Sequence, residues 1–269
     1  MHVALWGYKM KSKLKNYMKF YEKEGEYTER YKSNEFWERR HHTKRFIRIK
    51  RILKTLILKT LTKNNSFSFI DVGCGDGEYL KHIIKYKNKN SAIIGFDISF
   101  SYLKRAKIKS QKANFIRGDI TNLPVKDNSV DIALCSEVIE HIPDYKKCLK
   151  ELFRIAKKYI IITTPNHGLR RRIAEKIIGK ENVKKKSLKV GHVNIFFIKN
   201  LIKDINNIVS DDWELILKET QYNLIPPRNL PIPKYISHIL SYILVLIEYI
   251  FGKLFPDLGD TIILVYKRR

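Results

Sequence analysis

The stretch Phe69-Ile-Asp-Val-Gly-Cys-Gly-Asp-Gly-Glu78 decides the fold of this 269-residue chain. A short apolar run ends in Asp71, and Gly73, Gly75 and Gly77 then follow at every second position. The run predicts a buried strand, and the glycines predict a sharp turn that approaches a ligand closely. A helix is expected to begin there, with its free N–H groups facing the ligand. The spacing differs from the G-x-G-x-x-G of dinucleotide-binding turns, and Asp71 favours an ammonium group over a phosphate.

Strand and helix patterns alternate on both sides of this turn. Strands separated by helices of this length indicate βαβ units and a parallel, doubly wound α/β sheet. Ser99 or Ser101 is expected to cap one of the helices. We expect strands at residues 67–72, 92–98, 114–120, 130–136, 159–164, 213–222 and 260–267, and helices at 33–61, 78–86, 101–110, 144–156 and 198–209. Residues 167–192 are expected to form a helix plus a loop.

Three further acidic segments follow the glycine turn along the chain. Asp97 ends the second strand, where a carboxylate can accept hydrogen bonds from ribose hydroxyls of either a nicotinamide or an adenosyl cofactor. Gly118-Asp119-Ile120 ends the third strand, and Asn122 to Asp131 lead into the fourth. Together with the glycine turn, residues 66–166 resemble the class I S-adenosylmethionine (SAM) dependent methyltransferases, in the group that includes small-molecule methyltransferases.

The resemblance implies a seven-stranded Rossmann-like methyltransferase sheet with SAM as cofactor. It also implies a role for each matching residue in the cofactor site. The methionine part would lie against Asp71, Gly73, Gly75 and Gly77, the ribose against Asp97, and the adenine against Ile98, Asp119 and Ile120.

The segment from Cys135 to Asp144 contains Glu137, Glu140 and His141. It is similar to the E-x-x-E-H of the ubiquinone-biosynthesis O-methyltransferases. If this turn is helical, the three side chains lie on one face, where they can deprotonate a hydroxyl or hold a divalent cation. Glu140 and His141 are therefore candidate catalytic residues, and Glu137 is a candidate cofactor residue. The alternative is that Glu137 lines the cofactor pocket while the other two make supporting hydrogen bonds.

Two histidines follow the fifth strand, in segments that usually form the acceptor side of such enzymes. His167 and His192 are candidate acceptor-site residues, although a purely structural role is the commoner one. The chain departs from the family pattern before this strand, where Ala156-Lys-Lys-Tyr159 replaces the usual Pro-Gly-Gly turn. It also lacks the Asn-Pro-Pro-aromatic motif after the fourth strand, which argues against methylation of adenine or glutamine nitrogen.

The domain organisation follows from the flanking segments. Residues 1–65 are expected to form an N-terminal helical cap, and residues 66–269 a methyltransferase domain with a helical insertion at 223–259. The apolar run within this insertion is long enough to cross a bilayer. His238 and Glu248 interrupt it, and a strand of the main sheet follows at once. We therefore expect a lid over the active site or a helix lying in a membrane interface.

The charge balance is strongly basic, with 53 Lys and Arg against 27 Asp and Glu, a net of +26. The excess is concentrated in residues 1–65 and 165–203. Such patches favour RNA, an acidic membrane surface or an anionic substrate, whereas the simplest alternative is a solvated lysine-rich surface. Three cysteines without a zinc-binding spacing, and no signal peptide, indicate the cytoplasm, with or without peripheral attachment to the inner face of the membrane.

These patterns together predict a SAM-dependent methyltransferase that acts by direct displacement. The expected acceptor is a small or lipid-linked molecule with an anionic group, methylated at oxygen. The alternative acceptor is tRNA or another RNA, and the non-enzymatic alternative is a SAM-binding scaffold. A divalent cation is a possible second cofactor on the sequence evidence.

Overall fold

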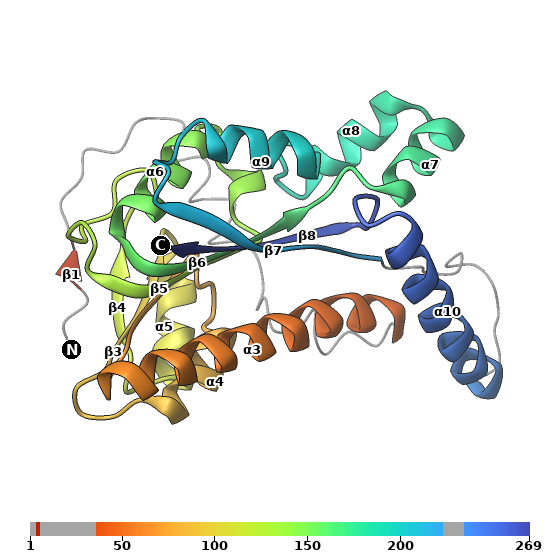
Figure 1. Ribbon diagram of the computed structural model, residues 1–269. Helices are drawn as coiled ribbons and strands as arrows, with labels where there is room; N and C mark the ends of the chain where they lie inside the picture. Colours follow the sequence, from red (N-terminus) through yellow and green to blue (C-terminus); the bar gives the residue numbers. More distant parts are fainter. Residues whose placement is uncertain (1–3, 6–35, 223–233) are drawn as a thin grey trace.

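The computed structural model describes residues 4–5, 36–222 and 234–269 (Figure 1). A single sheet runs through the molecule in the order β1-β4-β3-β2-β5-β6-β8-β7. The first six strands in this order pair in parallel, and β8 runs antiparallel to both of its neighbours. The strands are β1 (Ala4–Leu5), β2 (Ser68–Val72), β3 (Ala92–Asp97), β4 (Asn114–Arg117), β5 (Val130–Ser136), β6 (Ala156–Pro165), β7 (Trp213–Gln221) and β8 (Thr261–Arg268).

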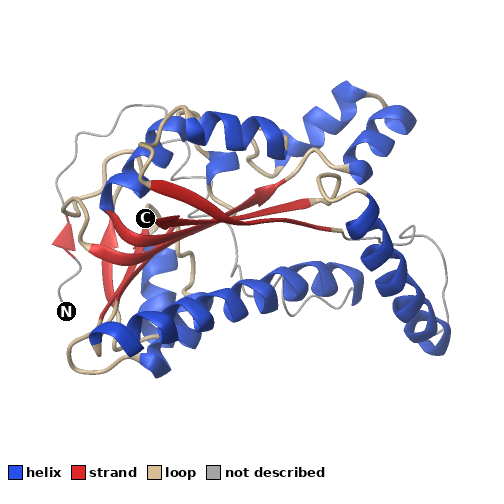
Figure 2. Ribbon diagram, in the orientation of Figure 1, coloured by secondary structure: helices blue, strands red, loops and turns tan. Residues whose placement is uncertain are grey.

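This sheet confirms the predicted seven-stranded, doubly wound α/β fold, to which the two-residue β1 adds an edge strand. Helices cover both faces of the sheet (Figure 2), so strands such as β5 are buried along their length and read as continuous apolar runs. The helices are α3 (Phe36–Asn64), α4 (Glu78–Ile83), α5 (Phe100–Lys109), α6 (Tyr145–Ile155), α7 (Leu169–Ile178), α8 (Lys180–Lys189), α9 (Ile198–Asn206) and α10 (Lys234–Leu254), with 3-10 turns η1 (Ile84–Tyr86) and η2 (Ile139–His141).

Two hydrophobic clusters hold these layers together. One lies between the sheet and α6 and α9, and the other between the sheet and α3, α4 and α5. The long helix α3 contributes Ile49, Leu53, Leu56 and Ile57 to the second cluster, at the three- and four-residue spacing of one helix face. Each such fully buried side chain stabilises the fold by about 1.5–3 kcal/mol. The helix is thereby fixed across one face of the sheet, close to the glycine turn.

Three of the differences from the sequence expectation have a clear local cause. Strand β4 ends at Arg117, because Asp119 accepts a hydrogen bond from the Thr121 backbone N–H and so forms a turn. Strand β6 begins at Ala156 directly after α6, which leaves no place for a separate Pro-Gly-Gly turn. Residues 169–189 form two helices where we expected a helix plus a loop, because Gly179, with φ of 81°, separates them. As predicted, Ser99 caps α5, accepting from the Tyr102 N–H at 3.3 Å.

The described part of the insertion before the last strand is helical over Lys234–Leu254, as predicted, and residues 223–233 of the predicted insertion lie outside the described residues. Helix α10 lies between β7 and β8 in the chain, and those two strands pair antiparallel. Among residues 36–222 and 234–269, no helix combines the length and the apolar character needed to cross a membrane. Any helix before α3 lies outside the described residues, so the N-terminal cap and its boundary at residue 65 stay predictions.

Candidate active site

The glycine turn lies at the carboxyl edge of the parallel strands, directly after β2. All three of its glycines have positive φ, at 77° for Gly73, 51° for Gly75 and 82° for Gly77. A Cβ atom on Gly73 would lie 2.3 Å from a methyl carbon of Val138, and one on Gly77 would lie 2.9 Å from the Cβ of Ala106. A Cβ on Gly75 would meet no atom within 4 Å. The outer two glycines are therefore required by packing, and the middle one faces open space where a ligand can approach.

Two buried carboxyl groups flank this turn. The Oδ2 atom of Asp71 accepts no hydrogen bond from any residue that the structure describes. Burial, and then the nearby charge of Asp97, raise the pKa of Asp71 to about 8. Asp97 accepts from the Gly75 N–H and the Ser99 N–H, each at 2.8 Å, and burial also raises its pKa. Asp97 thus ties the turn to β3, and its oxygens retain lone pairs for a ligand hydroxyl.

The third predicted carboxylate lies one strand further along the same edge. Asp119 is half-buried in the turn after β4, beside the end of β3, where the Gly118 N–H donates to the Asp97 carbonyl at 3.1 Å. Ile98 is half-buried, and its carbonyl accepts from Arg117 Nε at 3.0 Å. Ile120 is buried and belongs to the hydrophobic cluster on the α6 side of the sheet. The two strand ends thus bring Ile98 and Asp119 to neighbouring positions.

Glu137 follows β5 in a left-handed backbone conformation with φ of 58°. Its carboxylate accepts from Thr163 Oγ1 at 3.1 Å and from Arg45 at 2.8 Å. Arg45 is buried and comes from α3, so the N-terminal helix reaches the site directly. Sequence reasoning missed Arg45. The available signal was a charged residue four positions before Ile49, on the apolar face of the helix.

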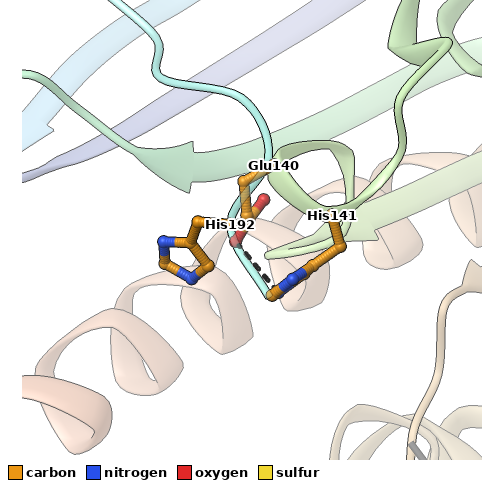
Figure 3. Close-up of side chains that lie close together, drawn as sticks. All are labelled: Glu140, His141 and His192. Carbon is orange, nitrogen blue, oxygen red and sulfur yellow. Dashed lines mark ion pairs between the residues drawn. The ribbon is translucent and has the colours of Figure 1, made fainter. Parts of the chain in front are cut away.

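Glu140 and His141 lie in η2, one turn further along (Figure 3). Glu140 is buried, and its Oε2 accepts from Thr164 Oγ1 at 2.9 Å. Burial, and then the charge of Glu137, raise the pKa of Glu140 well above its usual range. Its Oε1 lies 3.9 Å from His141 Nε2 and has no hydrogen-bond partner in the described part of the chain. This is the arrangement of a buried acid held next to an imidazole.

A second histidine completes the group. The rings of His141 and His192 lie edge to face, with centroids 4.9 Å apart. One nitrogen or oxygen atom from each of Glu140, His141 and His192 lies within 4.8 Å of the other two (Figure 3). The segment that carries His192 is held there because the Val193 and Asn194 N–H groups donate to the Glu140 carbonyl. We call these three side chains the Glu-His-His cluster.

The structure corrects the expectation that Glu137, Glu140 and His141 share one helical face. The 3-10 turn spans only Ile139–His141, and the left-handed Glu137 precedes it. The carboxylate of Glu137 pairs with Arg45 and stands outside the Glu-His-His cluster. His167 is also outside the cluster, because its Nε2 lies 3.1 Å from Glu175 and its ring stacks on Phe197 at 4.4 Å. Burial lowers the pKa of His167.

Comparison with known proteins places this arrangement in a family. The family described as "Methyltransferase domain" matches residues 63–221, which is more than half of the chain. An uncharacterized protein of Methanocaldococcus jannaschii is 29% identical over 188 residues, 70% of this chain and 73% of its own length. The malonyl-[acyl-carrier protein] O-methyltransferase of Hamiltonella defensa is 29% identical over 108 residues, 39% of this chain and 41% of its own length. The chain thus spans less than half of that second relative.

A solved structure agrees over nearly the whole length. Magnesium protoporphyrin IX methyltransferase from Synechocystis, with bound S-adenosylhomocysteine (SAH), superposes with a TM-score of 0.58 at 14% identity, covering 95% of this chain and 99% of its own. At that identity the likeness concerns the fold. The family match spans the glycine turn, the acidic strand ends and all three residues of the Glu-His-His cluster. The chain therefore belongs to the methyltransferase domain family and is a class I SAM-dependent methyltransferase.

Proposed function

We propose that this enzyme methylates an oxygen atom of a small or lipid-linked acceptor that carries an anionic group. The observation that carries the proposal is the Glu-His-His cluster beside the glycine turn, since Val138 joins the two by packing against Gly73. A hydroxyl must lose its proton as its oxygen attacks, and a buried carboxylate with an adjacent imidazole can take that proton. Glu140 and His141 are therefore the proposed catalytic residues.

The cofactor is proposed to lie along the carboxyl edge, from the glycine turn to the end of β4. The carboxylate of Asp71, which has an unsatisfied buried oxygen, is suited to the ammonium of the methionine part. The open space at Gly75 leaves room for the chain of the cofactor. Asp97 would accept from the ribose hydroxyls, and Asp119 from the adenine amino group. The remaining proposed contacts are Gly73, Gly77, Ile98, Ile120 and Glu137.

The Glu-His-His cluster also fits a divalent cation. One carboxylate and two imidazoles form a donor set that suits several divalent metals, and Glu140 Oε1 lacks another partner among the described residues. A bound cation would lower the pKa of an acceptor hydroxyl. His141 Nδ1 lies 3.0 Å from the Gly191 carbonyl, so Nδ1 carries the proton that it donates there, and Nε2, which lies 3.9 Å from Glu140 Oε1, would be the nitrogen that coordinates a cation. Thr164 holds the other Glu140 oxygen in place.

The class of acceptor is inferred from the surroundings of the cluster. Helices α7 and α8, which follow the carboxyl end of β6, hold nine basic and two acidic residues, and such a surface attracts an anionic acceptor. The Hamiltonella relative is an O-methyltransferase of malonyl-[acyl-carrier protein], in agreement with methylation at oxygen. We propose that the enzyme works in the cytoplasm, where a lipid-linked acceptor would be reached from the inner face of the membrane.

RNA is the second candidate acceptor, and the net charge of +26 is the observation that favours it. The two candidates separate in one experiment. The purified enzyme is incubated with SAM labelled in its methyl group and with either a lipid and metabolite extract or total RNA from the same cells. The proposal predicts label in an organic-soluble or anionic small product. Label in RNA alone would replace it with the second candidate, and label in neither fraction would favour a SAM-binding scaffold.

The role of the cluster is tested with two variants and a control. His141→Ala and His192→Ala should each lower turnover strongly and weaken Mn²⁺ binding measured by isothermal titration, while SAH affinity stays near that of the wild type. His82→Ala, which removes a half-buried histidine outside the cluster, should change none of these. Full turnover in both cluster variants, together with indifference to chelators, would leave the cluster purely structural.

A further inference from the structure

Helix α10 turns an apolar face outward. Six side chains along its second half are exposed by 44–65%: Ile243, Val245, Leu246, Tyr249, Ile250 and Leu254. The charged Glu248 is buried on the other side, where its carboxylate pairs with Lys44 of α3 at 2.7 Å. A surface helix normally has the reverse arrangement, with its charges outside. A continuous exposed apolar face of this kind marks a partner or a membrane.

The basic helices α7 and α8 lie at the same end of the molecule as α10, beyond the end of the sheet (Figure 1). The start of α7 is bonded to the segment that follows α10, because the Leu169 N–H donates to the Leu258 carbonyl at 2.8 Å. A Cβ on Gly168 would lie 2.3 Å from the Gly259 carbonyl oxygen, so the two segments are in direct contact. Between its basic residues this pair of helices also exposes Ile173, Ile177 and Leu188.

We propose that the outer face of α10, together with α7 and α8, docks the enzyme on an anionic lipid bilayer. We call this surface the docking face. The apolar side chains of α10 would enter the headgroup region, while the lysines and arginines of α7 and α8 meet the anionic headgroups. RNA would satisfy the charge but leave the hydrocarbon of α10 in water. A second copy would cover the hydrocarbon but bring two strongly basic surfaces together.

The docking face begins at the edge of the sheet that holds the site. Strand β6 ends at Pro165, which pairs with Thr261 at the start of β8, so α7 leaves and α10 returns at the carboxyl edge. The glycine turn and the Glu-His-His cluster lie at the carboxyl ends of the parallel strands, on that same edge. If the acceptor is lipid-linked, as the proposed function has it, this placement would let it enter the site from the bilayer without crossing water.

Vesicle flotation with the full chain tests the proposal. Wild-type enzyme should float with phosphatidylcholine–phosphatidylglycerol vesicles, and much less with phosphatidylcholine alone. Leu246→Glu/Ile250→Glu should lower the partition coefficient at least about tenfold, because two side chains that enter the headgroup region become charged. The control Ile108→Glu replaces an apolar residue that is 76% exposed on α5, away from the docking face, and should float like the wild type.

The basic part of the docking face is tested separately. Replacing Lys184, Lys185 and Lys186 on α8 by Glu should weaken flotation by at least roughly fivefold for each lysine that lies close to the surface. A matched reversal of three exposed lysines of α3, at Lys54, Lys59 and Lys63, removes the same charge and should have a much smaller effect. Equal loss in both triple variants would mean that net charge alone drives binding, which would overturn the role of α7 and α8.

Two results would overturn the docking proposal outright. The first is the absence of wild-type flotation, and in that case a dimer that the α10 variant breaks in sedimentation would identify a second copy as the occupant. The second is flotation of the α10 variant at the wild-type level. Titration of SAH and Mn²⁺ into the same proteins keeps the two proposals apart. A chain that binds both ligands but no vesicle refutes docking alone, whereas a chain that floats but binds no Mn²⁺ refutes the proposed cation site alone.

Discussion

Substitution of two glycines in the same turn should separate packing from cofactor binding. In Gly73→Ala, the left-handed backbone costs about 1–2 kcal/mol and the overlap with Val138 adds about 1–3 kcal/mol, so the free energy of unfolding should fall by roughly 2–5 kcal/mol. In Gly75→Ala, the backbone cost is similar, but the new methyl group meets open space. Its stability loss should therefore stay near about 1–2 kcal/mol.

The affinity for SAH should show a complementary pattern. The methyl group of Gly75→Ala would occupy the space proposed for the cofactor, so the affinity should fall at least about tenfold, or about 1.4 kcal/mol. Gly179→Ala is the matched control, because Gly179 also has positive φ and open surroundings but lies between α7 and α8. It should lose stability through backbone strain and keep its SAH affinity.

Urea unfolding followed by circular dichroism gives the stabilities, provided that the denaturant slope stays constant across the variants. Isothermal titration gives the SAH affinities under conditions in which each variant is folded. The reasoning would be refuted if Gly75→Ala bound SAH like the wild type. It would also be refuted if Gly73→Ala were no less stable than Gly75→Ala, because the contact with Val138 would then have no energetic consequence.

Two further predictions concern buried charges. Because burial raises the pKa of Asp71 from 3.8 to about 8, the folded chain keeps a proton that the unfolded chain loses, and this group should make stability fall as the pH rises through that window. SAH affinity should rise over the same window, because the carboxylate of Asp71 forms there. Isothermal titration at a series of pH values should show this rise for the wild type and not for Asp71→Asn. Arg45→Met should lower stability by up to about 3–5 kcal/mol because it leaves the half-buried carboxylate of Glu137 without its cation, whereas Arg45→Met/Glu137→Gln should recover part of that loss in urea unfolding. A double variant no more stable than the single one would show that packing of Arg45, and not its charge, is what matters.

Local patterns in the sequence predict most of the sheet. The apolar runs around Phe69 and Ile132 are unambiguous because both faces of a parallel sheet are covered. Boundaries set by a single hydrogen bond or by the backbone conformation of one residue were harder to predict. The end of β4 depends on the hydrogen bond that Asp119 makes to Thr121, and the separation of α7 from α8 depends on the backbone of Gly179. Neither follows from the spacing of apolar residues.

Contacts in the site that join distant segments were the least predictable part. His192 was proposed from its position after the fifth strand, yet its grouping with Glu140 depends on backbone bonds from Val193 and Asn194. The pairing of Arg45 with Glu137 joins residues 92 positions apart in the sequence. From the sequence alone, the carboxylate of Glu137 was expected to lie beside Glu140, because helical spacing places the two on one face.

The central claim is that the carboxyl edge of this sheet binds the methyl donor through its acidic strand ends. Titration of SAH into wild-type chain and into Asp97→Ala tests it most directly. Asp131→Ala is the control, because Asp131 is also a buried carboxylate but pairs with Ser68 and Lys158 at the opposite end of the strands. We expect wild type and Asp131→Ala to bind SAH alike, and Asp97→Ala to bind at least about tenfold more weakly, a loss of about 1.4 kcal/mol. Unchanged affinity in Asp97→Ala, or no binding by the wild type, would contradict the account.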